Sequence, residues 1–191
     1  MKYTTLSLAD VRSRLQDVAR DARTTFGAFD ARQLNWRADE SRWSVAQCFQ
    51  HLVTSNDLMV QAANAALGDA PRSVWQRLPG LPTLFGSALI NSQAPTSRGK
   101  YKAPPHARPT TSDIPADILD RFVTQQRMLA DWMATIDERR ASRVIMASPF
   151  IRFITYSVLD GCRLLVAHEH RHFEQARRVT QAAGFPITLV H

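Results

Sequence analysis

The chain has 191 residues, of which 45% are hydrophobic and 21% are charged. These proportions are typical of a globular protein and exclude disorder along the whole chain. A domain of this size buries about 70% of the surface that its unfolded chain exposes, so it can fold without a disulfide or a metal ion. We expect one domain over residues 1–191.

The net charge of +7 is concentrated in residues 70–112, a segment that contains no acidic side chain. Its six basic side chains account for six of the seven net positive charges. Such a segment raises the question of an anionic partner: nucleic acid, a membrane surface or an acidic small molecule. Because no nucleic-acid-binding motif accompanies it and the aromatic residues lie in apolar stripes, we expect no nucleic acid to bind.

The cysteines and the N-terminus indicate a cytoplasmic protein without a membrane partner. Cys48 and Cys162 are too few for a disulfide framework and form no CxxC motif, which favours a reducing compartment. Residues 1–15 lack the apolar core of a signal peptide. No apolar run approaches the ~20 residues that a membrane-spanning helix needs.

Apolar side chains recur at three- and four-residue steps in four segments, which predicts four long helices. The expected helices cover about residues 6–29, 44–67, 113–140 and 157–183. Three of them open with capping-box spacing: Ser7 with Asp10, Ser44 with Gln47, and Ser157 with Asp160. With little strand signal elsewhere, this organisation predicts an all-α domain, most simply a four-helix bundle.

Residues 69–112 interrupt the helical pattern between the second and third stripes. Seven of the ten prolines fall there, which excludes a long regular helix. Side chains such as Trp75 and Ile90 are nevertheless too apolar for a free linker. We expect a long irregular, proline-rich insertion whose first half packs on the domain, with room for a short helix. Its second half, from Ser92, should be extended.

Three of the six histidines are expected to face the inside of the bundle. His168 and His172 lie only ~40° apart around a helix and about one turn apart along it, on the apolar stripe. His51 lies on the inward stripe of the second helix. His170 points the other way and should be solvated, and Glu169 does not share the histidine face.

An inward histidine has two interpretations, a hydrogen-bonded core residue and a metal ligand. For any single histidine, including His51, the first is the more usual. Three together favour a metal, because three buried imidazoles without a shared role leave many polar atoms to satisfy. Two histidines four residues apart on a helix also have a familiar metal-ligand spacing.

Two short motifs stand 117 residues apart in the chain. The first is Trp43-Ser44 followed by Gln47 and His51-Leu52, and the second is His168-Glu-His-Arg-His172-Phe-Glu-Gln-Ala-Arg. In this order they resemble the DinB/YfiT-like family of metal-dependent enzymes. The resemblance implies an antiparallel four-helix bundle and a divalent metal on three histidines, which match His51, His168 and His172. The long basic insertion departs from the family pattern.

Three neutral imidazoles would leave a metal ion its full charge and an open position, which is the arrangement of catalytic sites. We expect zinc or nickel first, with iron, cobalt and manganese as further candidates. The open position can hold water, whose pKa falls toward ~7, or a thiolate. The resemblance implies the thiol: some members transfer low-molecular-weight bacterial thiols, and related ones isomerise maleylpyruvate with mycothiol. We therefore expect a thiol transferase or a hydrolase acting on a small molecule.

Several other residues are candidates for supporting roles, each with a plainer alternative. Those near the metal site are Cys48, Gln47, Ser55 and Gln175, although a cysteine is more often a buried apolar residue and the others caps or surface residues. Arg171 flanks the histidine pair, and we expect it to face solvent. The candidates for steering an acidic substrate are Arg98, Lys100, Lys102 and His106, unless the insertion is simply a solvated loop.

Two further hypotheses remain open at this point. One is a non-catalytic stress-response or nucleic-acid-binding bundle, and the other is a bundle that keeps a structural metal, or none, and catalyses nothing. The oligomeric state is also open, and a homodimer is compatible with the exposed faces of such helices.

Overall fold

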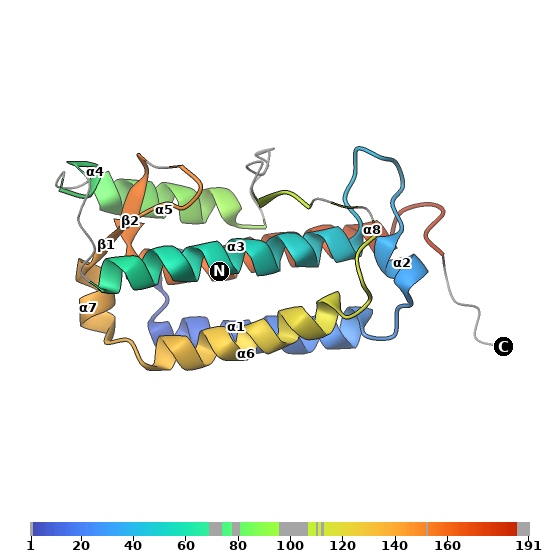
Figure 1. Ribbon diagram of the computed structural model, residues 1–191, viewed down its shortest axis with the longest axis horizontal. Helices are drawn as coiled ribbons and strands as arrows, with labels where there is room; N and C mark the ends of the chain where they lie inside the picture. The colour runs from blue at the N-terminus through green and yellow to red at the C-terminus, as the bar shows by residue number, and fades with distance from the viewer. Residues whose placement is uncertain are drawn as a thin grey trace.

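The computed structural model describes residues 2–68, 74–77, 81–95, 107–109, 111, 113–151 and 153–186. Its body is a bundle of four long helices, which confirms the all-α prediction (Figure 1). They are α1 (Leu8–Phe26), α3 (Val45–Leu67), α6 (Ile118–Ala134) and α8 (Val158–Thr180). α1 packs beside α6 and α3 beside α8, and the two helices of each pair run in opposite directions.

The capping residues place the helix starts where the sequence predicts them. Ser7 and Ser44 both complete capping boxes, and Ser157 accepts a hydrogen bond from the backbone of Asp160. A further capping box begins at Asp30 and starts the short helix α2 (Ala31–Asn35), which lies between the first two predicted helices. Each cap satisfies backbone N–H groups that have no partner within the helix.

The insertion is more regular than we expected. It contains α4 (Val74–Arg77) and the 13-residue helix α5 (Leu81–Gln93). Pro82 lies in the first turn of α5, where a missing N–H breaks no helical hydrogen bond, so the prolines do not exclude this helix. α5 packs against α8, and the insertion carries the chain back along the bundle before α6 begins (Figure 1).

The third predicted helix is also divided. α6 ends at Ala134, and α7 (Glu138–Arg143) follows as a separate short helix. A two-stranded antiparallel sheet of β1 (Ile145–Ala147) and β2 (Thr155–Ser157) lies between α7 and α8. A 3₁₀ turn, η1 (Tyr3–Thr5), precedes α1 and packs against α8.

The core consists of two apolar clusters along the length of the bundle. One is built around Leu15, Tyr156 and Leu165, and the other around Phe26 and Phe49. Between them, α3, α6 and α8 bury polar side chains: His51, Ser55, Asn56, Gln125, Gln126, Glu169 and His172. These seven side chains form a polar layer across the bundle, and the other buried polar side chains lie at helix starts and around the small sheet.

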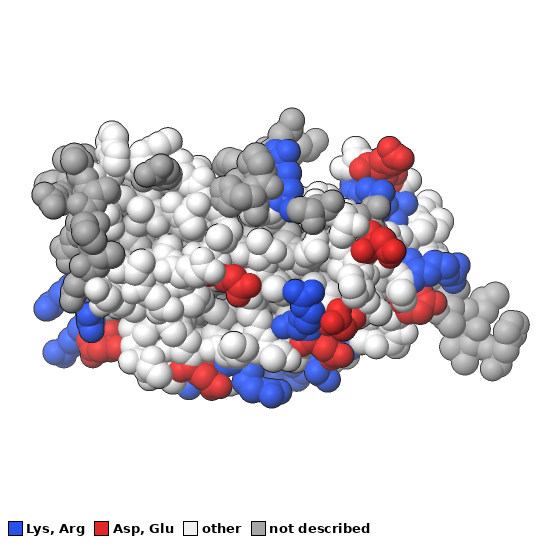
Figure 2. Space-filling model, viewed as in Figure 1, with Lys and Arg blue, Asp and Glu red and all other residues white. Residues whose placement is uncertain are grey.

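The outer surface adds two observations. On the face shown in Figure 2, charged side chains gather over α1 and α6 and at the α2 end, and few lie over the middle of α3. None of the described helices combines the length and the apolar character needed to cross a bilayer.

Candidate metal centre

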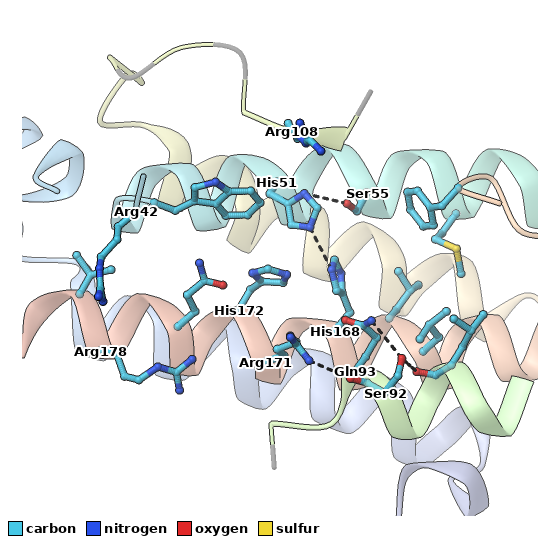
Figure 3. A pocket seen from close by; sticks show the side chains of 18 of the residues that line it. Arg42, His51, Ser55, Ser92, Gln93, Arg108, His168, Arg171, His172 and Arg178 are labelled. Atoms are coloured by element: carbon cyan, nitrogen blue, oxygen red, sulfur yellow. Dashed lines mark hydrogen bonds between the residues drawn. The ribbon is translucent and has the colours of Figure 1, made fainter. Parts of the chain in front are cut away.

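The three inward histidines meet at one point between α3 and α8. His51 comes from α3, and His168 and His172 come from successive turns of α8. One ring nitrogen from each can be chosen so that all three lie within 4.8 Å of one another, so these residues could hold a metal ion (Figure 3). The Nε2 atoms of His51 and His168 are 3.1 Å apart.

A backbone carbonyl fixes the ring of His51. Its Nδ1 lies 2.5 Å from the carbonyl oxygen of Ala107, a residue near the end of the insertion. Because a carbonyl oxygen only accepts, Nδ1 carries the proton and Nε2 keeps its lone pair for a ligand. The hydroxyl of Ser55 lies 3.5 Å from the same Nδ1, a much weaker contact.

Trp43 closes the site from the start of α3. Its ring stacks on His172 at a centroid distance of 5.7 Å and meets the His51 ring edge to face at 5.0 Å. The Nδ1 of His172 is buried and has no hydrogen-bond partner among the described residues. The site therefore holds at least one buried imidazole nitrogen that the protein itself does not satisfy.

All three histidines are neutral at pH 7. Burial lowers the pKa of His51, and it lowers the pKa of His168 and His172 well below the usual value of 6.5. For the two residues on α8, the neighbouring histidines and Arg171 lower the pKa further. Neutral imidazole is the form that binds a metal ion.

The donor set fits a divalent metal. Two ring nitrogens 3.1 Å apart cannot both present lone pairs to each other without repulsion. Nitrogens that each lie about 2.0–2.1 Å from a zinc ion are about 3.4 Å apart at a tetrahedral angle, close to this separation. One ion would thus convert three crowded acceptors into three ligands.

The histidines form one wall of a cavity of about 1100 Å³ between α3, α5 and α8. No acidic side chain is present among its described lining residues. Four arginines line it: Arg42, Arg108, Arg171 and Arg178 (Figure 3). Our expectation that Arg171 faces solvent is wrong, because it is half-buried and donates a hydrogen bond to the carbonyl of Ser92 at 2.9 Å.

The structure separates the other candidates for the site. Ser55 and Gln175 line the cavity beside the histidines. Gln47 instead completes the cap of α3 and donates to the carbonyl of Thr111 at 3.1 Å, so it ties the insertion to the helix start. Cys48 is fully buried in the apolar cluster around Phe49, where burial raises the pKa of its thiol to about 12. A neutral thiol enclosed by apolar side chains is neither a nucleophile nor a metal ligand.

Two predictions about the HEHRH segment have different outcomes. Glu169 does lie off the histidine cluster, but it is fully buried and bonds Asn56. The prediction that His170 is solvated is wrong, because it is half-buried and its Nδ1 lies 2.7 Å from the hydroxyl of Tyr3. The 3₁₀ turn at the N-terminus covers this face of α8, a long-range contact that helix periodicity does not reveal.

The four predicted steering residues, Arg98, Lys100, Lys102 and His106, lie outside the described residues. The described end of the insertion nevertheless reaches the site, through the carbonyl of Ala107 and the side chain of Arg108. Sequence reasoning missed both of these, and it missed Trp43 as part of the site. The signal for Trp43 was its place directly before the capping residue Ser44, in the same short motif as His51.

A family model described as the DinB superfamily matches residues 8–176. The chain belongs to the DinB superfamily. The matched range runs from the first residue of α1 almost to the end of α8, so it includes all three histidines of this DinB-superfamily chain. No curated protein and no solved structure matches the chain.

Proposed function

We propose that this DinB-superfamily chain is a divalent-metal-dependent enzyme acting on a small molecule, as a thiol transferase or a hydrolase. The observation that carries the proposal is the convergence of three neutral imidazoles on one wall of a large cavity. Three ligands leave at least one coordination position for a reactant, and the cavity leaves room for it.

A purely structural metal fits these residues less well. Structural zinc sites are closed by four protein ligands, commonly including cysteines. Among the described residues the cluster contains three histidines, and Cys48 lies in an apolar cluster instead. The fold also has two extensive apolar clusters and does not need a metal ion to hold it together.

The residues around the histidines have separable roles in this proposal. A zinc or nickel ion bound by His51, His168 and His172 would supply Lewis acidity, lowering the pKa of a coordinated water or thiol. The carbonyl of Ala107 orients the ring of His51, and Trp43 packs on two of the three rings. Orientation of the ligands and exclusion of water both strengthen interactions with a bound ion.

The first test is the metal content of the purified, untagged protein beside three variants. We expect about one divalent ion per chain in the wild type, lost in His51→Ala and His168→Ala. His170→Ala is the matched control, because it removes a histidine of the same helix that lies outside the cluster and should retain the ion. Absence of metal from the wild type, even after incubation with zinc or nickel, would overturn the proposal.

A second test addresses catalysis itself. The metal-free and reloaded proteins are compared in thiol-transfer assays with low-molecular-weight thiols and in ester and amide hydrolysis assays. We expect activity that returns only with the ion and that is absent in His168→Ala. Full occupancy without turnover in either class of assay would contradict the enzymatic proposal while leaving the metal site intact.

A further inference from the structure

The wall of the cavity that α8 forms changes character along the helix. Leu164 and Leu165 line it first, followed by His168 and His172, and then by Arg178. At a rise of about 1.5 Å per residue, Leu164 lies about 6 Å before His168 and Arg178 about 9 Å beyond His172. The histidines therefore separate an apolar end from an end where Arg178 lies beside Val179 and Ala182, here called the cationic end.

The opposite wall, formed by α3 and the residues that precede it, repeats this order. Arg42 comes shortly before α3, His51 lies two turns into the helix, and Met59 lies two turns further on. Because α3 and α8 run in opposite directions, Arg42 lies at the same end as Arg178 (Figure 3). Met59 lies close to Gly161 near the start of α8, which places it at the apolar end.

Both arginines of the cationic end are exposed, and only Arg42 has an acidic partner among the described residues. Arg178 forms no ion pair with a described carboxylate, and Arg42 pairs with Asp39 at 3.0 Å only through an exposed contact. Exposed ion pairs of this kind contribute little stability and are readily replaced by another anion. A guanidinium also matches the geometry of a carboxylate or phosphate better than any other side chain does.

Arg171 extends the positive charge to the histidines themselves. Its guanidinium lines the cavity beside the histidines and donates to the carbonyl of Ser92 at 2.9 Å. The described cavity lining thus contains arginines and no acidic side chain, which favours an anionic reactant over a neutral one.

The other end of the cavity suits an apolar group. Met59 and Leu164 belong to the apolar cluster around Leu165, and Leu89, Phe150 and Ile154 pack against that cluster while also lining the cavity. An apolar chain or ring placed there would leave water for a surface that already consists of hydrocarbon.

We propose that the cavity binds an amphipathic anion, with its carboxylate or phosphate between Arg42 and Arg178 and its apolar part against Met59, Leu89 and Phe150. The reacting group then lies between these ends, beside the histidines. This inference rests on the proposed function in taking the cavity as a substrate site. The cationic end itself is built without metal ligands, so its binding can be measured on the metal-free protein.

The test uses octanoate and octyl phosphate as anionic probes and 1-octanol as the neutral probe of the same chain length. Binding to metal-free and zinc-loaded protein is followed by calorimetry. We expect the anions to bind metal-free protein more than about tenfold tighter than the alcohol, because a charged hydrogen bond contributes more than a neutral one. Arg178→Gln and Arg42→Gln should each weaken only the anions, by about tenfold.

Two further variants identify the ends of the cavity. Met59→Gln should weaken all three probes, because it makes the apolar end polar. Arg127→Gln is the matched control: it removes the same charge from an exposed position on α6 that does not line the cavity, and it should change nothing.

Three results would overturn the inference. One is equal affinity for octanoate and 1-octanol, and another is unchanged anion binding in Arg178→Gln and Arg42→Gln. The third is octanoate binding that requires zinc and disappears in His51→Ala, which would put the anion on the metal ion rather than on the arginines. Anion binding to a protein that takes up no metal would instead support the cationic end while overturning the proposed enzyme.

Discussion

α3 and α8 bury two neighbouring polar clusters that differ in their ligand atoms and in their access to the cavity. One is the histidine cluster of His51, His168 and His172. The other, here called the amide–carboxyl cluster, contains Asn56, Gln125, Gln126 and Glu169. Glu169 directly follows His168 in the chain, yet the two side chains belong to different clusters on different faces of α8.

Hydrogen bonds join part of the amide–carboxyl cluster, although Oδ1 of Asn56 and Oε1 of Gln126 have no partner among the described residues. Asn56 donates from Nδ2 to Gln125 at 3.0 Å and to Glu169 at 2.9 Å. Gln125 in turn donates to Asp57 at 2.7 Å. Burial raises the pKa of Glu169 to about 8, against the opposing effect of its bond with Asn56, so the carboxyl is protonated at neutral pH. Protonation also gives this carboxyl a donor of its own.

The histidine cluster consists of ring nitrogens alone. The Nε2 atoms of His51 and His168 lie 3.1 Å apart and share a hydrogen bond only when His168 carries its proton on Nε2, and Nδ1 of His172 has no hydrogen-bond partner among the described residues. The cluster also borders a cavity, whereas the amide–carboxyl side chains are not among the residues that line it. Buried polarity alone therefore does not identify a ligand site in this protein. A ligand site is indicated instead by imidazole nitrogens that converge at the wall of a cavity.

The comparison predicts that Asn56 matters for stability and not for the metal. Asn56→Ala leaves Gln125 and Glu169 without their shared donor, which should lower the free energy of unfolding by about 2–4 kcal/mol. Zinc content per folded chain should stay at the wild-type level. Denaturant unfolding and elemental analysis of the same preparation measure both quantities. A variant that loses zinc but keeps its stability would reverse the roles of the two clusters.

The second prediction concerns pH and the histidine cluster in the metal-free protein. The folded-state pKa values of His168 and His172 lie well below 6.5, so unfolding takes up protons as the pH falls below that value. Their stabilising contribution is present above pH 6.5 and is lost below it, by about 2 kcal/mol for the pair between pH 6.5 and 5.5. Over the same range, the titration of Glu169 changes the free energy of unfolding in the opposite direction. The measurement is therefore made on proteins that carry Glu169→Gln.

The control for this pH series carries His168→Gln and His172→Gln in the same background. Its unfolding free energy should change by about 2 kcal/mol less over this range, because His51 and His170 are then the only described histidines whose pKa burial lowers. A slope that survives both substitutions would show that other groups control the acid sensitivity.

The sequence predicts this bundle well where local signals decide the structure. Ser7, Ser44 and Ser157 begin α1, α3 and α8 because a capping side chain acts within three residues of itself. The meeting of the histidines was predictable for the same kind of reason, since helix periodicity places His168 and His172 on one inward face. His51 lies on another helix, and only the resemblance of the two sequence motifs connected it with this pair.

Contacts between distant segments could not be predicted in this way. Tyr3 covers His170, and Ala107 orients His51, through bonds that span 167 and 56 residues. The positive charge at the site was predicted from the composition of the insertion, but Arg171 and Arg178 bring much of it from α8. Composition shows where charge lies in the chain, and only the packing of α3 against α8 shows which charges face one cavity.

The third prediction sharpens the protonation state of the amide–carboxyl cluster. The pKa of Glu169 is raised from its unfolded value near 4.5 to about 8, so its contribution to stability is complete below pH 4.5 and is lost as the pH rises through 8. The wild type should therefore lose about 1 kcal/mol between pH 6.5 and 7.5 relative to Glu169→Gln. Denaturant titrations at the two pH values measure this difference, and parallel pH profiles would show that Glu169 is ionised in the folded protein.

The smallest expected effect is on zinc affinity, and it distinguishes the two groups that lie near Nδ1 of His51. The Ser55 hydroxyl lies 3.5 Å from Nδ1 of His51. The Ala107 carbonyl oxygen lies only 2.5 Å from Nδ1 and already accepts its hydrogen bond. Ser55→Ala should therefore change zinc affinity by less than about threefold, well below the 10–100-fold cost of losing a true orienting partner. Competition with a chelating dye measures the affinity, with Thr54→Ala as a control for removing a hydroxyl from the same turn of α3. If Ser55→Ala alone lowers zinc affinity about tenfold or more, Ser55 of α3, and not the insertion, orients His51. The insertion would then contact the histidine cluster without fixing the orientation of its rings.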